Sequence, residues 1–235
     1  MIKEAIILAG GMGTRLKSIT GSLPKPMAPV NGRPFLEYIL DYLELYSVKR
    51  VILSVGYNHE AIESHFKKRY KYINIDYAIE ETPLGTGGGI LQAMKMIEGR
   101  RAIVMNGDTM YRVNLGKLYD FTQVHKANIA LALREVNDVS RYGAVEINER
   151  AIITSFREKG EISGKGMISG GVYAINKDFF LDFGLPEAFS MEKDFFEKIY
   201  KEQSIYGIRC NQFFLDIGIP EDYQKAQDEF KLFEY

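Results

Sequence analysis

The sequence predicts an α/β fold of Rossmann-like type, with a mixed, mainly parallel sheet flanked by helices. In the first half, short apolar runs alternate with helical patterns, as they do in parallel βαβ units. In the second half, short apolar runs are separated by polar turns, which predicts a region of mixed sheet. The chain has 235 residues, of which 46% are hydrophobic, so it can bury one substantial core.

In the first half, apolar runs and helical periodicity predict four strands and three helices. The strands are expected at residues 4–8, 51–55, 73–79 and 102–106. The helices are expected after Pro34 through residue 43, at residues 61–66, and up to residue 96, the last preceded by a glycine-rich loop at residues 84–89. Ligands of open α/β sheets gather at the carboxyl ends of the strands, so a site is expected there.

The second half is predicted to consist of short strands followed by helices. Strands are expected at residues 129–133, 144–147, 152–156 and 168–175, and a last strand pair at 205–209 and 213–216. Helices are expected at residues 177–183, 191–201 and 220–233. Because no repeat, low-complexity tract or linker interrupts the sequence, a single domain over residues 1–235 is predicted.

The bulk composition excludes several classes of protein. A formal net charge of −1 argues against a nucleic-acid partner. The single cysteine, Cys210, cannot form an internal disulfide, and no cysteine set suggests a zinc site. No apolar run approaches the ~20 residues that cross a bilayer, and no signal peptide precedes the first strand. We therefore expect no membrane contact and a cytoplasmic location, while the oligomeric state stays undetermined.

A glycine-rich segment after the first strand carries the clearest functional signal. Residues 5–16 read AIILAGGMGTRL, and Pro24-Lys25-Pro26 follows. Glycines let the backbone approach a ligand and present several N–H groups to anionic oxygens. Arg15 and Lys25 add two positive charges, and the flanking prolines restrict the backbone around Lys25. The pattern predicts a polyphosphate site.

The spacing excludes two other phosphate-binding loops. A Walker loop requires Lys-Ser/Thr after its glycines, and none follows here. A dinucleotide fingerprint requires a third glycine where Leu16 stands, and an acid at the end of the next strand. A glycine-rich turn without a ligand is the remaining alternative, and the added Thr14-Arg15 and Pro-Lys-Pro segments argue against it.

These segments resemble the signature of the sugar-1-phosphate nucleotidyltransferase (nucleotide-sugar pyrophosphorylase) family, a Leu-Ala-Gly-Gly-x-Gly-Thr-Arg-Leu loop with a downstream Pro-Lys-Pro. The resemblance extends to Phe214-Leu-Asp216-Ile-Gly218 and so covers nearly the whole chain. Within the family, the chain is similar to the small guanylyltransferases that act on D-glycero-D-manno-heptose 1-phosphate. The resemblance implies the nucleotide-diphospho-sugar transferase fold, with a nucleotide-binding half at about residues 1–125 and a sugar-binding half at about residues 126–235.

The resemblance also implies a reaction, in which a sugar-1-phosphate oxygen attacks the α-phosphorus of a nucleoside triphosphate and pyrophosphate leaves. The nucleophile is already an anion at pH 7, so catalysis depends on bringing two anions together and stabilising their charge. Arg15 is expected to bind the β,γ-phosphates, and Lys25 the α-phosphate and the incoming phosphate. The nucleotide-binding residues expected around them are Leu8, Gly10, Gly11, Gly13 and Thr14.

Two aspartates that end apolar strands are candidate metal ligands, Asp108 in Asn-Gly-Asp and Asp216 in Leu-Asp-Ile-Gly. A lone aspartate at a strand end is more often a turn former or a helix cap. In the family, however, aspartates at these two positions bind the metal. Magnesium prefers a few carboxylates together with water and substrate phosphates, so Mg²⁺ is the expected cofactor.

The segment Glu80-Glu81-Thr-Pro-Leu-Gly85 matches the base-recognition loop of the family. Guanine presents two neighbouring N–H donors, which one carboxylate accepts with charge assistance. Uracil and thymine have one N–H between two carbonyls, which suits an amide. The acid at Glu80 therefore favours GTP, with Gly85 contacting the base through its backbone, although Glu81 competes for the role and either acid could be solvated.

The sugar site is expected from segments of the second half whose order matches the family: Arg141-Tyr-Gly143, Phe156-Arg-Glu-Lys159, Gly170-Gly171 and Glu192. In the family, a Glu-Lys pair binds the sugar hydroxyls and the sugar phosphate, and Glu158 and Lys159 match it. The family often continues with proline, whereas this chain continues with Gly160. The sugar-phosphate-binding residues expected here are Tyr142, Gly143, Glu158, Lys159, Gly171 and Glu192.

Three alternatives stay open. The same loop would serve mannose 1-phosphate, or a uridylyl or cytidylyl transfer to another sugar phosphate. A catalytically silent protein that binds nucleotide sugars could keep the fold without the catalytic charges. The four expected charged residues are all present here: Arg15, Lys25, Asp108 and Asp216. A metal-dependent glycosyltransferase should carry Asp-x-Asp after the fourth strand, whereas Asn106-Gly-Asp108 offers one acid.

Overall fold

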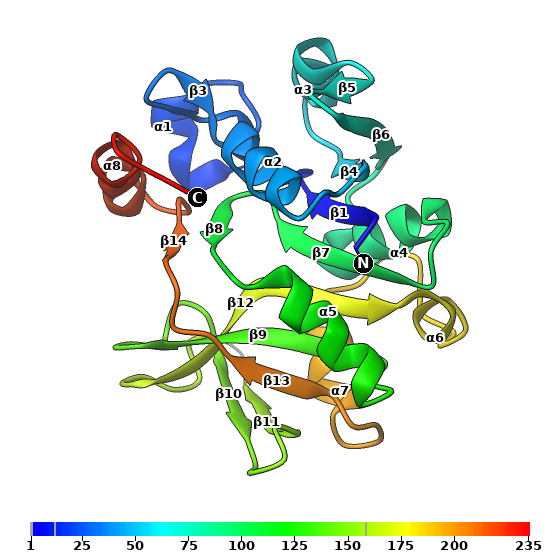
Figure 1. Ribbon diagram of the computed structural model, residues 1–235. Helices are drawn as coiled ribbons and strands as arrows, with labels where there is room; N and C mark the ends of the chain where they lie inside the picture. The colour runs from blue at the N-terminus through cyan, green and yellow to red at the C-terminus, as the bar shows by residue number, and fades with distance from the viewer. Residues whose placement is uncertain (1, 12, 158) are drawn as a thin grey trace.

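The computed structural model describes residues 2–11, 13–157 and 159–235, which form a central eight-stranded sheet between two layers of helices (Figure 1). The strand order is β13-β9-β12-β7-β1-β4-β6-β5. β1 pairs in parallel with β4 and β7, and β4 with β6, whereas β12 runs antiparallel to β7 and β9. The predicted α/β fold with a mixed, mainly parallel sheet is confirmed.

The sheet contains strands from both halves of the chain. Its strands are β1 (Glu4–Leu8), β4 (Arg50–Val55), β5 (Arg69–Tyr70), β6 (Ile73–Ile79), β7 (Arg101–Asn106), β9 (Ile129–Val136), β12 (Gly166–Asn176) and β13 (Tyr206–Arg209). Three two-stranded ribbons join β2 (Pro29–Val30) to β3 (Arg33–Pro34), β8 (Thr109–Tyr111) to β14 (Phe214–Asp216), and β10 (Ala144–Ile147) to β11 (Ile153–Arg157). A single domain stays a prediction, which the continuous sheet supports.

The helices lie on both faces of this sheet. They are α1 (Lys17–Thr20), α2 (Phe35–Leu45), α3 (His59–Phe66), α4 (Gly85–Met96), α5 (Leu115–Val124), α6 (Lys177–Leu181), α7 (Glu197–Ile199) and α8 (Pro220–Glu229). Two 3-10 turns, η1 (Thr14–Leu16) and η2 (Lys25–Met27), and the π-helix η3 (Met191–Phe196) complete the set. In the described part of the chain, no helix is both long and apolar enough to cross a membrane.

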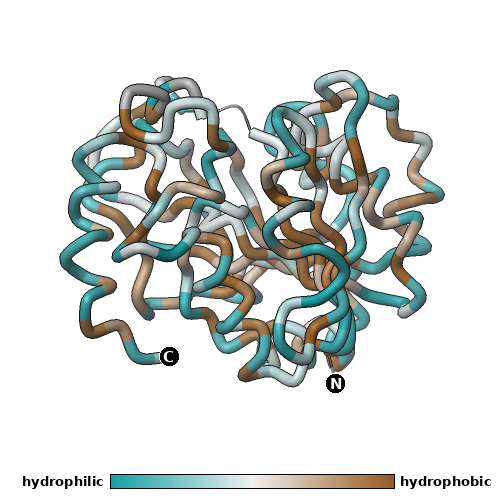
Figure 2. The backbone as a smooth tube through the Cα atoms, turned by 90° about the horizontal axis from the view of Figure 1, so that it is seen from above, coloured by the Kyte–Doolittle hydropathy of each residue, from teal (hydrophilic) through white to brown (hydrophobic). Residues whose placement is uncertain are grey.

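Two hydrophobic cores cover the two faces of the sheet, because successive side chains of a strand point to opposite faces. Ile7 and Leu53 belong to the core beneath α2, α5 and α8. Their neighbours Ile6 and Ile52 belong to the core beneath α4 and α6. Figure 2 shows the hydrophobic residues gathered in the central strands, whereas the helix that leads to the C-terminus is mostly hydrophilic. Both faces are therefore buried, as a mainly parallel sheet requires.

One predicted strand pairing is wrong. Residues 205–209 and 213–216 were expected to pair with each other. Instead, β13 extends the large sheet in parallel with β9, and β14 pairs antiparallel with β8. Hydrophobic patterning identifies both strands, but the partner of each depends on contacts with segments far away in the sequence.

Every predicted helix also has at least one boundary that differs, and three of the differences are large. The expected helix at 191–201 is divided into η3 and α7, and the last helix ends at Glu229 instead of residue 233. The glycines placed in a loop at 84–89 instead form the first turn of α4, which begins at Gly85. A run of glycines has low helix propensity, so this start depends on the tertiary contacts described below.

The β8–β14 ribbon brings two distant aspartates together. Thr109 lies opposite Asp216 in the ribbon. The N–H of Ile217 donates to the carbonyl oxygen of Asp108 at 3.0 Å. β8 follows directly on β7, so both acids lie where the central strands end.

Candidate active site

A cleft of about 750 Å³ opens at the carboxyl ends of β1, β4, β6 and β7. Seven of the residues predicted from the sequence line it: Leu8, Gly10, Gly11, Lys25, Glu80, Gly85 and Asp108. The remaining lining residues are Pro26, Gly56, Tyr57, Asn58, His59, Glu60, Ile79, Glu81, Thr82, Pro83, Thr86 and Asn106. The cleft is therefore where strand topology predicts a ligand site.

The glycine-rich loop packs closely against Lys25 and Glu80, two residues that were predicted to belong to the same site. A Cβ atom on Gly13, whose φ is +57°, would lie 2.9 Å from the Cβ of Lys25. A Cβ on Gly10 would lie 3.0 Å from Glu80 Oε1, whereas one on Gly11 would meet nothing within 4 Å. Thr14 and Arg15 follow in η1, and Arg15 is exposed. The loop leaves Gly11 accessible to a ligand.

Lys25 lies between the two aspartates. Its Nζ is 2.5 Å from Asp108 Oδ2 and 3.6 Å from Asp216 Oδ1. Burial lowers the pKa of Lys25, but the two carboxylates raise it by more, so the pKa is above its ordinary value and the ammonium stays charged at neutral pH. Lys25 begins η2, in which the N–H of Ala28 donates to its carbonyl oxygen at 3.0 Å. The three groups form one compact charged cluster.

Asp216 carries an unusual proton affinity. Burial, followed by the charge of Asp108, raises its pKa to about 6, although Lys25 opposes the change. Its Oδ1 is buried and accepts no hydrogen bond from the residues that the structure describes. Its one ion-pair partner among those residues is the Lys25 ammonium at 3.6 Å, so this buried oxygen still fits a divalent cation, which needs oxygen ligands. Asp108 and Asp216 would hold that cation.

The described residues form no cluster of three or more His, Cys, Asp or Glu side chains suited to a metal. Two carboxylates alone leave most of the coordination sphere of a cation to other ligands. Magnesium commonly completes its sphere with water and substrate phosphates. The pair therefore suits a cation that arrives with, or is completed by, a phosphorylated substrate.

We expect the stabilising effect of Asp216→Asn to depend on pH. The pKa of Asp216 in the folded protein lies above its ordinary value, so protonation of this carboxyl favours the folded state. That contribution to stability is fully present below the ordinary pKa and is lost as pH rises through about 6. An asparagine is not ionised, so the melting temperature of the variant should rise relative to wild type between pH 4.5 and pH 7.5. Thermal melting in EDTA measures this difference, with Asp120→Asn on the exposed side of α5 as control. A difference that is constant with pH would contradict the raised pKa.

Glu80 is already hydrogen-bonded within the chain. Its Oε1 accepts from Ser54 Oγ at 2.9 Å, and its Oε2 accepts from the N–H of Leu84 at 3.1 Å. Because Leu84 precedes Gly85, Glu80 closes the turn that leads into α4. Glu81 is exposed and also lines the cleft. The carboxylate of Glu80 is therefore held by two hydrogen bonds, whereas Glu81 is exposed to solvent.

The glycines of this loop pack against the segment before η3. A Cβ on Gly85, whose φ is +73°, would lie 2.6 Å from the carbonyl oxygen of Phe189. A Cβ on Gly87 would lie 2.1 Å from the ring of Phe189, and one on Gly88 would lie 2.3 Å from the carbonyl oxygen of Glu187. These glycines open α4, and their lack of side chains makes room for residues 187–189.

The loop that carries Tyr142 and Gly143 reaches the aspartates. Burial, followed by the charge of Asp216, raises the pKa of Tyr142 to about 12, which indicates that its ring lies near that carboxylate. The N–H of Gly160 donates to the carbonyl oxygen of Ser140 at 2.9 Å, which joins this loop to the one that carries the exposed Lys159. Glu158 lies outside the described residues.

Gly171 and Glu192 lie on separate elements of the sugar-binding half. A Cβ on Gly171, whose φ is +72°, would lie 2.4 Å from Asn106 Nδ2, so the backbone of β12 closely approaches the end of β7. Glu192 is the second residue of η3 and accepts hydrogen bonds from Thr86, Ser190 and Tyr173. Glu192 therefore connects the second half to the cleft residue Thr86.

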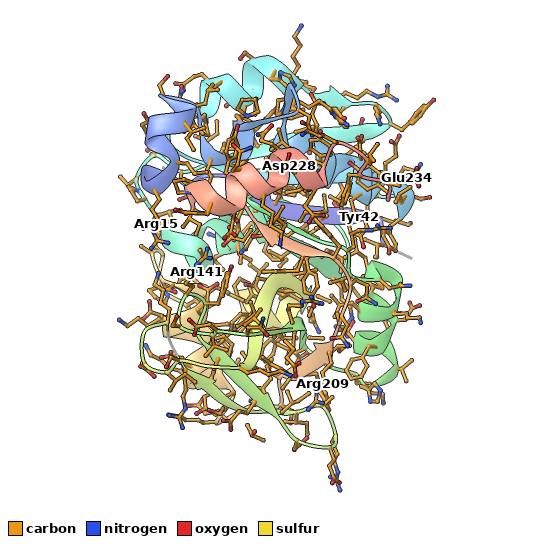
Figure 3. The ribbon with its side chains drawn as sticks, turned by 90° about the vertical axis from the view of Figure 1, so that its left-hand side faces the viewer. Arg15, Tyr42, Arg141, Arg209, Asp228 and Glu234 are labelled. Atoms are coloured by element: carbon orange, nitrogen blue, oxygen red, sulfur yellow. The ribbon has the colours of Figure 1, made fainter. Side chains whose placement is uncertain are left out.

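One part of the site, the cleft wall at residues 56–60, was missed in the sequence. It follows β4, and the strand-end rule that located Asp108 could have found it. Arg141, which belongs to the expected sugar segment, forms a 2.8 Å ion pair with Asp222 at the start of α8, and its charge lowers the pKa of Asp216. Figure 3 shows Arg141 and Arg15 at the same side of the molecule.

The chain belongs to the nucleotidyl transferase family, whose sequence profile it matches over residues 4–231. The fold and the cleft agree with an enzyme that transfers a nucleotidyl group.

Two curated relatives are named D-glycero-alpha-D-manno-heptose 1-phosphate guanylyltransferase. The one from Campylobacter jejuni is 46% identical over 199 residues, covering 85% of this chain and 87% of the relative. The one from Aneurinibacillus thermoaerophilus is 46% identical over 204 residues, covering 87% of this chain and 88% of the relative. The crystal structure of HddC from Yersinia pseudotuberculosis complexed with GMP-PN has a TM-score of 0.85 and 39% identity, covering 97% of this chain and 100% of that chain.

Proposed function

We propose that this protein transfers a guanylyl group from GTP to D-glycero-α-D-manno-heptose 1-phosphate, giving GDP-heptose and pyrophosphate. The observation that carries the chemistry is Lys25, held between Asp108 and Asp216 at the edge of the cleft. The two heptose guanylyltransferases at 46% identity support this sugar, and the HddC complex with GMP-PN supports a guanine nucleotide. Because GTP is used inside the cell, we also propose a cytoplasmic location.

The chain's own residues bind and orient two anions. The phosphate oxygen of the sugar 1-phosphate attacks the α-phosphorus of GTP while the bond to the β-phosphate oxygen breaks, and no general base is needed. Arg15 and the amides near Gly11 bind the leaving pyrophosphate. Lys25 neutralises charge between the α-phosphate and the incoming phosphate. A Mg²⁺ ion held by Asp108 and Asp216 would act as a Lewis acid at the phosphate oxygens.

On the sugar side, two cations and one acid are proposed to bind the second substrate. Lys159 binds the sugar phosphate, and Arg141, on the adjoining loop, lies near enough to Asp216 to strengthen the positive potential there. Glu192 accepts a hydrogen bond from a sugar hydroxyl, while Tyr142 and the backbone of Gly171 form the surface on which the sugar lies. These roles explain why the described residues of the site include charged groups and no nucleophile–histidine pair.

Pyrophosphate release tests this function. The protein is incubated with Mg²⁺ and each of GTP, UTP, CTP, ATP and dTTP, each combined with heptose, mannose and glucose 1-phosphates. Release that is fastest with GTP and heptose 1-phosphate supports the proposal. A preference for mannose 1-phosphate overturns the sugar assignment, and a preference for UTP or CTP overturns the base assignment. Nucleotide binding without release with any pair would favour a binding protein.

Glu80→Gln is expected to lower kcat/KM for GTP by about 10- to 100-fold, because one charge-assisted hydrogen-bonding pair with guanine is lost. The amide can still accept from Ser54 or the N–H of Leu84, so the melting temperature should change little. Steady-state kinetics with GTP and UTP measure the change, and Glu81→Gln is the matched variant in the same loop. If Glu81→Gln causes the loss instead, Glu81 recognises the base and the assignment to Glu80 is wrong.

A further inference from the structure

Thr86 contacts both halves of the proposed site. It lies in the first turn of α4 and lines the nucleotide cleft. Its Oγ1 accepts from the N–H of Met191 at 2.9 Å and donates to Glu192 Oε2 at 2.9 Å. A hydroxyl has one proton, so this pair of contacts fixes the direction of the donation to Glu192. One side chain therefore joins the cleft to the acid that is proposed to bind the sugar.

The backbone around Thr86 is joined to the same segment. The N–H of Phe189 donates to the carbonyl oxygen of Leu84 at 2.9 Å, and the N–H of Gly87 donates to the carbonyl oxygen of Phe189 at 2.9 Å. With the glycine contacts described above, residues 84–88 and 187–192 form one packed unit. A displacement of either segment therefore requires a displacement of the other.

The carboxylate of Glu192 has one acceptor position left. Oε2 accepts from Thr86 and from Ser190 Oγ at 3.2 Å, and Oε1 accepts from Tyr173 OH at 3.3 Å. Each carboxylate oxygen accepts about two hydrogen bonds, so among the described residues Oε1 is half satisfied. Three donors hold the group in place. This is a preorganised acceptor for one ligand hydroxyl.

We propose that Thr86 is a positioning residue that couples the two substrate sites. A sugar hydroxyl on Glu192 Oε1 stabilises the arrangement in which this carboxylate accepts from Thr86, and through Thr86 it stabilises the position of the loop at Gly85 that faces the nucleotide. Sugar 1-phosphate then tightens nucleotide binding, and the nucleotide tightens sugar binding by the same factor. The proposal rests on the proposed function, since it takes Glu192 as the sugar-binding acid.

The test compares wild type with Thr86→Val, which keeps the shape and removes the hydroxyl, and with Thr86→Ser, which restores it. Thr154→Val, on the exposed side of β11, is the control. Calorimetry gives the dissociation constant of a GTP analogue with a methylene bridge between the α- and β-phosphates, with and without heptose 1-phosphate. We expect heptose 1-phosphate to tighten binding roughly 5- to 10-fold in wild type, Thr86→Ser and Thr154→Val. In Thr86→Val the factor should be close to one.

Kinetics provide the second readout. In Thr86→Val, KM for heptose 1-phosphate should rise about tenfold, as expected for losing one hydrogen bond to a charged group. A Thr86→Val protein that keeps the wild-type coupling factor overturns the proposal. Equal losses in Thr86→Val and Thr86→Ser also overturn it, because they would indicate a packing role.

Two further measurements separate the possible failures. If wild type releases pyrophosphate with a different pair of substrates, the assignment of the substrates is wrong. The same variants are then compared with that pair, which still tests the coupling. If no pair reacts, the proposed function fails, and this inference fails with it. Should Thr86→Val not fold, hydrogen exchange of wild type replaces it: heptose 1-phosphate alone should protect peptides covering residues 84–96, and no protection overturns the coupling.

Discussion

Lys25→Met is expected to reduce kcat by roughly 10³-fold and, at the same time, to tighten the binding of Mn²⁺ to the protein without substrate. The loss of rate follows from removing a fixed positive charge at the point where the two phosphates are proposed to meet. The gain in metal affinity follows from the geometry, because the Lys25 ammonium lies 2.5 Å from Asp108 Oδ2 and 3.6 Å from Asp216 Oδ1. The same two carboxylates would bind the metal, so metal and lysine repel each other.

Mn²⁺ titration followed by electron paramagnetic resonance measures the affinity in the absence of nucleotide. We expect Kd for Mn²⁺ to fall on the order of tenfold in Lys25→Met, and to be unchanged in Lys117→Met, whose lysine lies exposed on α5. An unchanged Kd would mean that metal and Lys25 do not share these carboxylates. A variant with wild-type kcat would remove Lys25 from the mechanism altogether.

Gly85→Ala is expected to lower kcat/KM for GTP by about 100-fold and to destabilise the protein. The glycine has φ +73°, and an added Cβ would lie 2.6 Å from the carbonyl oxygen of Phe189. That oxygen belongs to the backbone, so no side-chain rotation relieves the contact, and the loop must move away from residues 187–189. Moving the loop displaces both Gly85 and Thr86 from the cleft wall.

Gly184→Ala is the matched control. Gly184 has φ +72°, but a Cβ there would meet nothing within 4 Å. It therefore carries the backbone strain alone, about 1 kcal/mol, which corresponds to a melting temperature lowered by roughly 2–4 °C. Calorimetry should show that Gly85→Ala lowers the melting temperature two to three times as much as Gly184→Ala does. Kinetics should show wild-type activity for Gly184→Ala. Equal effects of the two variants would show that contact with Phe189 is unimportant.

The strands and the fold class follow from local patterning. β1, β4, β6 and β7 lie within a residue or two of their expected positions because each is an apolar run bounded by polar residues or glycine. The expected pairing of residues 205–209 with 213–216 failed because a hydrophobic pattern does not specify a partner strand. The helix start at Gly85 was missed because glycine has low helix propensity, and contact with Phe189 overrides it.

The candidate site was predictable where chemistry is carried by short motifs. Lys25 and Asp108 lie in the cleft or at its edge together with Gly10 and Gly11, as the motif and the strand-end rule predicted. The catalytic and binding roles stay predictions. The base-recognition prediction left Glu80 and Glu81 as alternatives, and only the structure showed that the oxygens of Glu80 each accept one hydrogen bond within the chain, from Ser54 and from Leu84.

By itself, the sequence determined the family and the α/β class and predicted the residue types of a phosphate- and metal-binding site, because these depend on periodicity and on short contiguous motifs. Only the tertiary structure decided which groups meet. It placed Lys25 between two aspartates that are 108 positions apart in the chain, and Thr86 against Glu192. It also raised the pKa of Asp216 to about 6. Burial and pairing arise from packing between distant segments, and no local pattern encodes them.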